Sequence, residues 1–267
     1  MRRASQRQRA ELVSILTIKD PRTETMLGIV RRMEALLKIF RARAEFAGLI
    51  PFCETYRLIA RDIMLIPEKT PKRFGQVEKL DRLNVAFIAY YFQALRQFVA
   101  TGKATRHWQA YFLYCQLPNG SPFLQMILGV NAHINGDFPH ALLETRYANR
   151  KDFLLMNRLL EDEVPTVMRF LAFGEKDRLA LGGVLFKKFA RQQFHQIVIR
   201  WRLGAWRSAT ALKTKKMTSA QLATATEAIG RQLIEIFAHA PKFDRAIPDL
   251  KQVQGLRVSL VKPLRRA

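Results

Sequence analysis

Cysteine is scarce in this sequence. The 267 residues include two cysteines, Cys53 and Cys115, and neither belongs to a Cys-x-x-Cys spacing. Two cysteines cannot form the disulfide framework of a small secreted domain, and their spacing does not match the usual zinc-binding motifs. Unpaired cysteines are typical of a reducing compartment, so we expect a cytoplasmic protein.

Long apolar runs are absent as well. No stretch approaches the ~18 consecutive apolar residues that a membrane-spanning helix needs. The basic N-terminus holds one short apolar segment, residues 12–18, directly after Glu11, and it lacks the small-residue cleavage site of a secretory leader. We expect residues 1–22 to form a basic arm. Peripheral contact with a membrane stays open.

The motifs that identify several enzyme classes are missing. The sequence has no P-loop, no Gly-x-Gly-x-x-Gly pattern, no His-Glu-x-x-His and no Gly-x-Ser-x-Gly. It also lacks the alternation of apolar and polar residues that is typical of strands, apart from a weak candidate at 256–261. These absences leave a helical protein without a recognisable nucleotide-binding or serine-hydrolase signature.

Apolar residues recur at helical spacing along most of the chain. Positions 26, 29, 30, 33, 36, 37, 40 and 44 form one stripe, and positions 77, 80, 87, 91, 94 and 98 form another. Thr218 and Gln221 match a capping box at the start of a later helix. The spacing predicts a single all-α domain of about eight helices over residues 23–240, followed by a basic tail over 241–267. We expect breaks at Gly48–Pro51, 67–76, Gly102, 118–122 and Pro241.

Positive charge is concentrated in the last third of the chain. The formal net charge is +23, and residues 178–226 contain ten Lys or Arg and no acidic residue. Such a surface attracts phosphate groups of lipid headgroups or nucleic acid. The alternative is a solvated face without a partner. The basic residues expected on the exposed flank of the helix at 178–216 are Lys187, Lys188, Arg191, Arg202 and Lys213.

One polar segment interrupts an apolar helix face. His133, Asp137 and His140 continue the spacing of three and four residues that Met126 and Val130 begin. Burying ionisable groups is costly unless hydrogen bonds, an opposite charge or a metal ion compensate. His133 could serve as a base or a metal ligand, with Asp137 orienting or co-ligating it and His140 adding a second nitrogen. The cofactor stays open, with a divalent metal ion as one candidate.

A structural interpretation of the same segment is also available. Asn135-Gly136 is a turn signal, and Asp137 with Pro139 resembles a helix N-cap followed by proline in the first turn. In that case Asp137 is a cap and His133 is a core histidine. The sequence leaves the two interpretations open.

Four asparagines complete the candidate site. Asn131 and Asn135 lie within the segment itself, and Asn84 and Asn157 lie on or near the apolar stripes of other helices. Each could bind a small-molecule ligand or hydrogen-bond the His–Asp pair. Hydrolysis or isomerisation is the chemistry expected of such a pair. The substrate and the oligomeric state stay open.

The segment from Asn131 to Asp137 resembles the Asn-Ala-His-Ile-Asn-x-Asp signature of a protein family known as a domain of unknown function. The runs at 90–95, 123–134, 150–160 and 202–212 are similar to further segments of that family, so the resemblance covers roughly residues 25–212. It implies a helical fold and no established activity. His140 lies outside the signature, which weakens a metal role for that residue.

Overall fold

The computed structural model of the chain describes residues 6–64, 66, 71–118, 120–171 and 183–238. These residues form helices joined by short turns, and no strand occurs among them, which confirms the predicted all-α class. The strand candidate at 256–261 and the expected tail at 241–267 lie outside the described residues. Within the described part, no helix is long and apolar enough to span a membrane.

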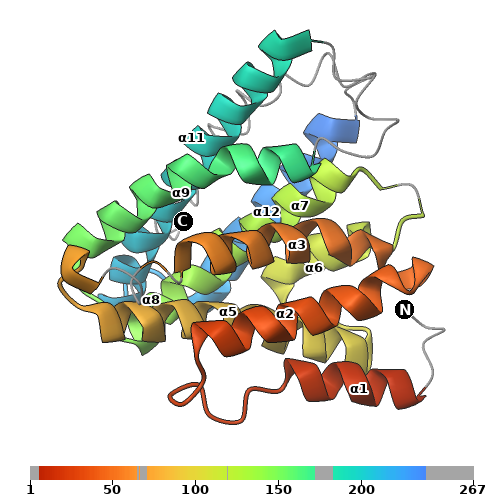
Figure 1. Cartoon of the computed structure of the whole chain (residues 1–267), viewed down its shortest axis with the longest axis horizontal. Helices are drawn as coiled ribbons and strands as arrows, with labels where there is room; N and C mark the ends of the chain where they lie inside the picture. The colour runs from red at the N-terminus through yellow and green to blue at the C-terminus, as the bar shows by residue number, and fades with distance from the viewer. Residues whose placement is uncertain (1–5, 65, 67–70, 119, 172–182, 239–267) are drawn as a thin grey trace, which may run out of the picture.

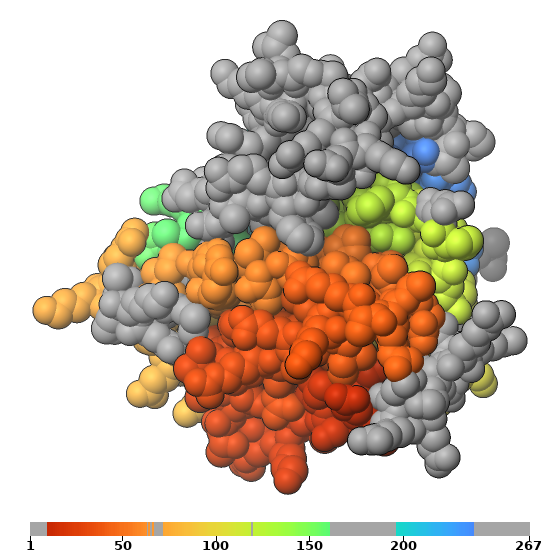
Figure 2. Space-filling view, turned by 45° about the vertical axis from the view of Figure 1, so that its right-hand side comes forward, coloured from red at the N-terminus to blue at the C-terminus, as the bar shows by residue number. Residues whose placement is uncertain are grey.

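The N-terminal helices pack side by side. α1 (Gln6–Leu16) lies against α5 and α2, and α2 (Met26–Arg41) lies against α3 (Ile50–Ile59). Figure 1 shows α2 beside α3, and in Figure 2 the N-terminal residues, coloured red to orange, lie side by side on one face of the molecule. Leu12 and Leu16 of α1 are buried in the core. Part of the segment expected as a basic arm is therefore a packed helix, because two leucines one turn apart give it an apolar side. A short 3-10 helix (Ala44–Leu49) precedes α3, and a π-helical turn (Ala60–Met64) follows it.

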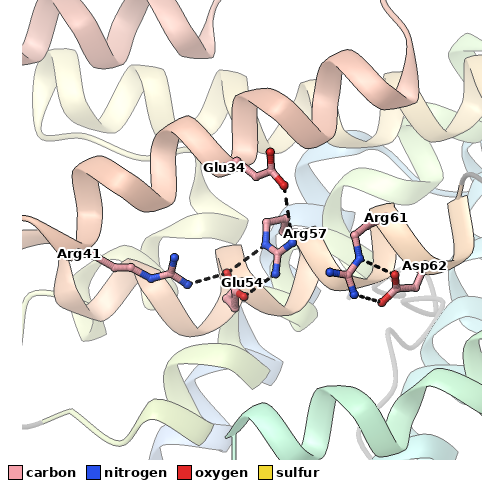
Figure 3. A network of polar contacts seen from close by, with 6 residues as sticks. All are labelled: Glu34, Arg41, Glu54, Arg57, Arg61 and Asp62. Atoms are coloured by element: carbon pink, nitrogen blue, oxygen red, sulfur yellow. Dashed lines mark hydrogen bonds and ion pairs between the residues drawn. The ribbon is translucent and has the colours of Figure 1, made fainter.

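Charged side chains fix α3 on α2. Glu54 is buried, and its carboxylate accepts hydrogen bonds from Arg57 at 2.7 Å and from Arg41 at 3.0 Å. Glu34 forms an ion pair with Arg57 at 3.8 Å, and Figure 3 shows these contacts between the two helices. Arg41 and Glu34 lie on α2 and their partners Glu54 and Arg57 on α3, so two charged contacts join the helices.

The middle of the chain supplies the central helices. α5 (Val77–Thr101) follows a short 3-10 turn (Pro71–Arg73) and ends at Gly102, as predicted, where the backbone takes a left-handed conformation with φ of 70°. α6 (Arg106–Tyr114) and α7 (Pro122–Asn131) come next. The chain then continues through a π-helical segment, η4 (Ala132–Asp137), into α8 (Phe138–Glu144).

Three longer helices complete the fold. α9 (Arg150–Leu171) packs against α3 and α11, α11 (Gly183–Lys213) packs against α8 and η4, and α12 (Ser219–Ala238) packs against α6 and α7 (Figure 1). The predicted capping box is confirmed, since the Thr218 N–H donates to Gln221 Oε1 at 2.8 Å and the Gln221 N–H donates to Thr218 Oγ1 at 3.2 Å. The η4 segment contacts α5, α6, α7, α8, α11 and α12, so the polar segment singled out in the sequence lies at the centre of the described fold.

Candidate functional site

The polar segment is a helix with a wide turn. η4 follows α7 without a break, and the Phe138 N–H donates to the carbonyl of His133, five residues earlier. Pro139 has no N–H, and its ring would clash with the carbonyl four residues before it in α geometry, which favours a wider turn at this point. Asp137 has helical backbone angles (φ −83°, ψ −41°) and makes no side-chain cap bond. The interpretation of Asp137 as an N-cap is therefore wrong.

Asp137 is the centre of a buried hydrogen-bond cluster. Three ring nitrogens contact its carboxylate: His133 Nδ1 at 3.0 Å, His107 Nε2 at 2.7 Å and Trp108 Nε1 at 3.1 Å. Burial alone would raise the pKa of Asp137, but the hydrogen bonds from His107 and His133 outweigh it and hold that pKa below its ordinary value. Asp137 is therefore a buried carboxylate that remains ionised.

The geometry around His133 assigns its tautomer. Burial lowers the pKa of His133, and the neighbouring Asp137 opposes that shift only in part, so the imidazole is neutral near pH 7. A neutral ring whose Nδ1 contacts a carboxylate carries its proton on Nδ1 and leaves Nε2 with a lone pair. His133 Nε2 is buried and has no hydrogen-bond partner among the residues that the structure describes.

Aromatic rings enclose the His133 imidazole. Phe87 stacks on it with a centroid distance of 3.6 Å and an interplanar angle of 2°, and Tyr56 meets it edge-on at 4.6 Å. Phe52 and Trp108 lie further out, at 5.8 and 6.0 Å. Their side chains come from α3, α5 and α6, so three helices contribute rings to the surroundings of the histidine.

Asn131 and Asn135, the two predicted asparagines within the motif, hydrogen-bond other parts of the fold. Asn131 Nδ2 donates to the Thr226 carbonyl at 3.0 Å, which joins the end of α7 to α12. Asn135 Nδ2 donates to Asn131 Oδ1 at 3.0 Å, across the wide turn. Both side chains are buried, and these bonds explain their presence without a ligand.

The metal interpretation does not fit the residues present. His140 is half-buried beside Tyr90, at a centroid distance of 6.1 Å, and no contact joins it to Asp137 in the described structure. Among the described residues, no group of three or more His, Cys, Asp or Glu side chains could hold a metal ion. The carboxylate oxygens of Asp137 accept N–H groups instead, so we derive no step through a metal.

A second buried polar group lies near the histidine. Arg202 on α11 is 7% exposed, and its Nε donates to Asn157 Oδ1 on α9 at 2.6 Å. The prediction that Arg202 lies on an exposed basic flank is therefore wrong, because Phe138 and Phe153 cover its guanidinium. Asn84 Nδ2 on α5 is buried without a partner within the described part of the chain.

The other residues predicted for the basic flank are only partly described. Lys213 is exposed near the end of α11. The side chains of Lys187, Lys188 and Arg191 lie outside the described residues. Arg200, Arg207, Lys215 and Lys216 are exposed and belong to the same basic stretch.

Sequence reasoning missed three residues of the cluster. His107 and Trp108 lie on α6, 30 and 29 residues before Asp137, and nothing in their spacing links them to that residue. Tyr56 shares the apolar stripe of α3 and was indistinguishable from a core residue. One signal was present: the adjacent His107 and Trp108 are ring N–H donors at the start of a helix, and buried indoles usually find an acceptor.

The fold and the site define an all-helical protein built around a buried histidine–carboxylate cluster. The chain belongs to the family of unknown function DUF5995, whose model matches residues 27–236. This match confirms the resemblance to an uncharacterised domain family. Comparisons with curated proteins and with solved structures found no match.

Proposed function

We propose that the protein is an enzyme of the hydrolase or isomerase type, in which His133 is the general base and Asp137 orients it. The observation that carries the proposal is the lone pair of His133 Nε2. This nitrogen is buried and has no hydrogen-bond partner within the described structure. The other ring nitrogen, Nδ1, is held by the Asp137 carboxylate. A histidine held in this way by a carboxylate has the arrangement that acid–base catalysis uses.

The proposed step is a proton transfer at Nε2. In hydrolysis, Nε2 takes a proton from water as the water oxygen bonds to the acyl carbon, and the imidazolium then returns that proton to the leaving alkoxide. Asp137 stabilises the imidazolium, while His107 and Trp108 hold the carboxylate in place. Isomerisation would use the same nitrogen to remove a proton next to a carbonyl group and return it to another atom.

The surroundings support a role beyond packing. A buried nitrogen without a partner costs roughly 1–3 kcal/mol, and replacing the histidine by an apolar residue would remove that cost. Tyr56 OH is a second buried polar atom without a partner in the described structure, and its ring contacts the same imidazole. Two unpaired polar atoms in one aromatic enclosure are a pattern that a bound substrate would complete.

An activity panel with matched variants tests the proposal. Aryl esters would be assayed for hydrolysis, and ketones with exchangeable α-protons for deuterium uptake, with the wild type and the His133→Gln, Asp137→Asn and His140→Gln variants. We expect at least one substrate to lose about 10²-fold or more in rate on His133→Gln, since a general base contributes about 10²–10⁴-fold. His140→Gln should keep the wild-type rate. Folded His133→Gln protein with unchanged turnover across the panel would contradict the proposal.

A second candidate function rests on the exposed basic residues of the stretch at 178–226. Arg200, Arg207, Lys213, Lys215 and Lys216 are exposed, and no acidic residue lies between positions 178 and 226. We propose that this face binds an anionic surface, either lipid headgroups or nucleic acid, through phosphate contacts. This binding does not require the His133 cluster, so the two proposals are tested separately.

A further inference from the structure

The guanidinium of Arg202 has no anionic partner among the side chains that the structure describes. Its Nε donates to Asn157 Oδ1, and its Cζ lies 4.6 Å from the Phe138 ring centroid and 5.4 Å from that of Phe153. Within the described part of the chain, no carboxylate forms an ion pair with it. A buried cation is costly unless it is paired, and Asn157 with two aromatic faces compensates only in part.

Other unpaired donors lie around this cation. Asn157 Nδ2 and Tyr56 OH are buried and have no hydrogen-bond partner in the described structure. Asn157 holds the Arg202 Nε through its Oδ1, and the Tyr56 ring lies 5.9 Å from the Phe87 ring between centroids. Ring contacts connect Arg202 with His133. The Phe138 ring, which Arg202 covers, lies 4.5 Å from the Phe87 ring, and Phe87 stacks on His133.

Building on the proposed acid–base function, we propose that the substrate is a carboxylic acid anion with an apolar body, and that Arg202 binds its carboxylate. Asn157 Nδ2 and Tyr56 OH would donate further hydrogen bonds to the same group, and Phe138 and Phe153 would contact the apolar body. The planar guanidinium matches a carboxylate in two-point contact. One positive charge offsets one negative charge, whereas a phosphate dianion would leave excess negative charge close to Asp137.

Calorimetric titration of the full-length chain tests this inference. The probes are 3-phenylpropionate, its uncharged analogue 3-phenylpropanamide, and inorganic phosphate. We expect saturable binding of the carboxylate, and at least about tenfold weaker binding of the amide, because one charge-assisted hydrogen bond to a buried cation is worth that factor. Equal affinities for carboxylate and amide, no binding of the carboxylate, or tighter binding of phosphate would overturn the inference.

Asn157→Asp is the decisive variant. It places a carboxylate next to the Arg202 Nε without changing the size of the side chain, so the protein then supplies the missing anion itself. We expect the melting temperature to stay the same or rise, and the affinity for 3-phenylpropionate to fall at least about tenfold. The matched control is Arg158→Gln, which removes an exposed charge one residue after Asn157, outside the basic face, and should leave the affinity unchanged. Undiminished binding by folded Asn157→Asp protein would overturn the inference.

Two more variants keep the outcome interpretable. Tyr56→Phe deletes a hydroxyl that has no partner in the described structure, so the fold should persist while the affinity for 3-phenylpropionate falls; if Asn157→Asp fails to fold, this variant carries the test. His133→Gln should still bind the carboxylate. Binding that survives in His133→Gln without any His133-dependent turnover would contradict the acid–base proposal and leave the Arg202 inference standing.

Discussion

The Asp137 carboxylate is the residue on which the cluster depends. Three ring N–H groups from two elements converge on it, and it is 2% exposed. Each donor would lose a charged acceptor if the carboxylate were neutralised. This concentration of contacts predicts that a substitution of Asp137 destabilises the fold.

Asp137→Asn is expected to destabilise the fold by about 3 kcal/mol, because breaking a buried charged network leaves donors facing an amide that can also donate. Urea unfolding of the variant and the wild type measures the difference. Glu235→Gln, an exposed position on α12, is the matched control and should stay within ~0.5 kcal/mol. A loss for Asp137→Asn no larger than that of the control would contradict the described hydrogen bonds.

The lowered pKa of His133 predicts acid sensitivity. Its folded-state pKa lies below the unfolded value of about 6.5, so the unfolded chain binds the extra proton first as the pH falls. The stability contributed by neutral His133 is therefore complete above pH ~6.5 and is lost as the pH drops from there toward the folded pKa.

Denaturant unfolding from pH 8 to pH 5 measures this effect. The wild type should lose stability over this interval, and His133→Gln should lose less, because Gln does not titrate. His140 also has a pKa lowered by burial, so His140→Gln serves as the comparison that separates the two contributions. Identical pH profiles for wild type and His133→Gln would contradict the assigned neutral state.

At the scale of the element, the wide turn of η4 positions the cluster. Helical spacing in the sequence correctly places His133 and Asp137 one turn apart on a buried face. The sequence could not reveal the π-helical turn, because Asn135-Gly136 and Pro139 are equally typical of a helix end. Contacts of η4 with six other helices outweigh the preference of these residues for a helix end, so the helix continues through them.

Gly136 provides an element-scale prediction. A Cβ atom at this position would lie 2.3 Å from the His107 ring, so Gly136→Ala must displace either His107 or α6. We expect a loss of about 1–3 kcal/mol, which is typical of overpacking. Gly204→Ala on α11 is the matched control, since nothing lies within 4 Å of its Cβ, and it should stabilise the helix by about 0.5–1 kcal/mol.

Thermal unfolding of the two glycine variants checks this prediction. Opposite shifts in melting temperature support the close approach of α6 to η4. A Gly136→Ala variant that is as stable as the Gly204→Ala variant would mean that His107 does not pack against the wide turn.

At the scale of the whole molecule, composition and periodicity sufficed for the fold class. The apolar stripes of α2 and α5 and the capping box of α12 were all readable from the sequence. The convergence of His107, Tyr56 and Arg202 on the motif was not, because it depends on how α6, α3 and α11 pack. Arg202 is an example. Its position in a basic stretch of the sequence predicts an exposed side chain, but aromatic rings and Asn157 bury it in the fold.

The exposed charges give a prediction at this scale. If the basic face binds phosphates, affinity for random DNA or for phosphatidylserine vesicles should fall steeply with salt, with a slope near −0.9 per phosphate contact on duplex DNA. Gel shift and vesicle co-sedimentation distinguish the two surfaces. Replacing Arg200, Arg207, Lys213, Lys215 and Lys216 by Gln should abolish binding, and His133→Gln should not. If the protein binds neither DNA nor vesicles at low salt, the basic residues form a solvated face without a partner.

The most direct test of the central claim is the protonation of the His133 ring. Histidine-labelled protein at pH 7, observed by two-bond ¹H–¹⁵N correlation NMR, reports which ring nitrogen carries the proton, and the signals missing from His133→Gln identify the residue. We expect a neutral ring protonated at Nδ1, with an unprotonated Nε2. A proton on Nε2, or an imidazolium at pH 7, would contradict it.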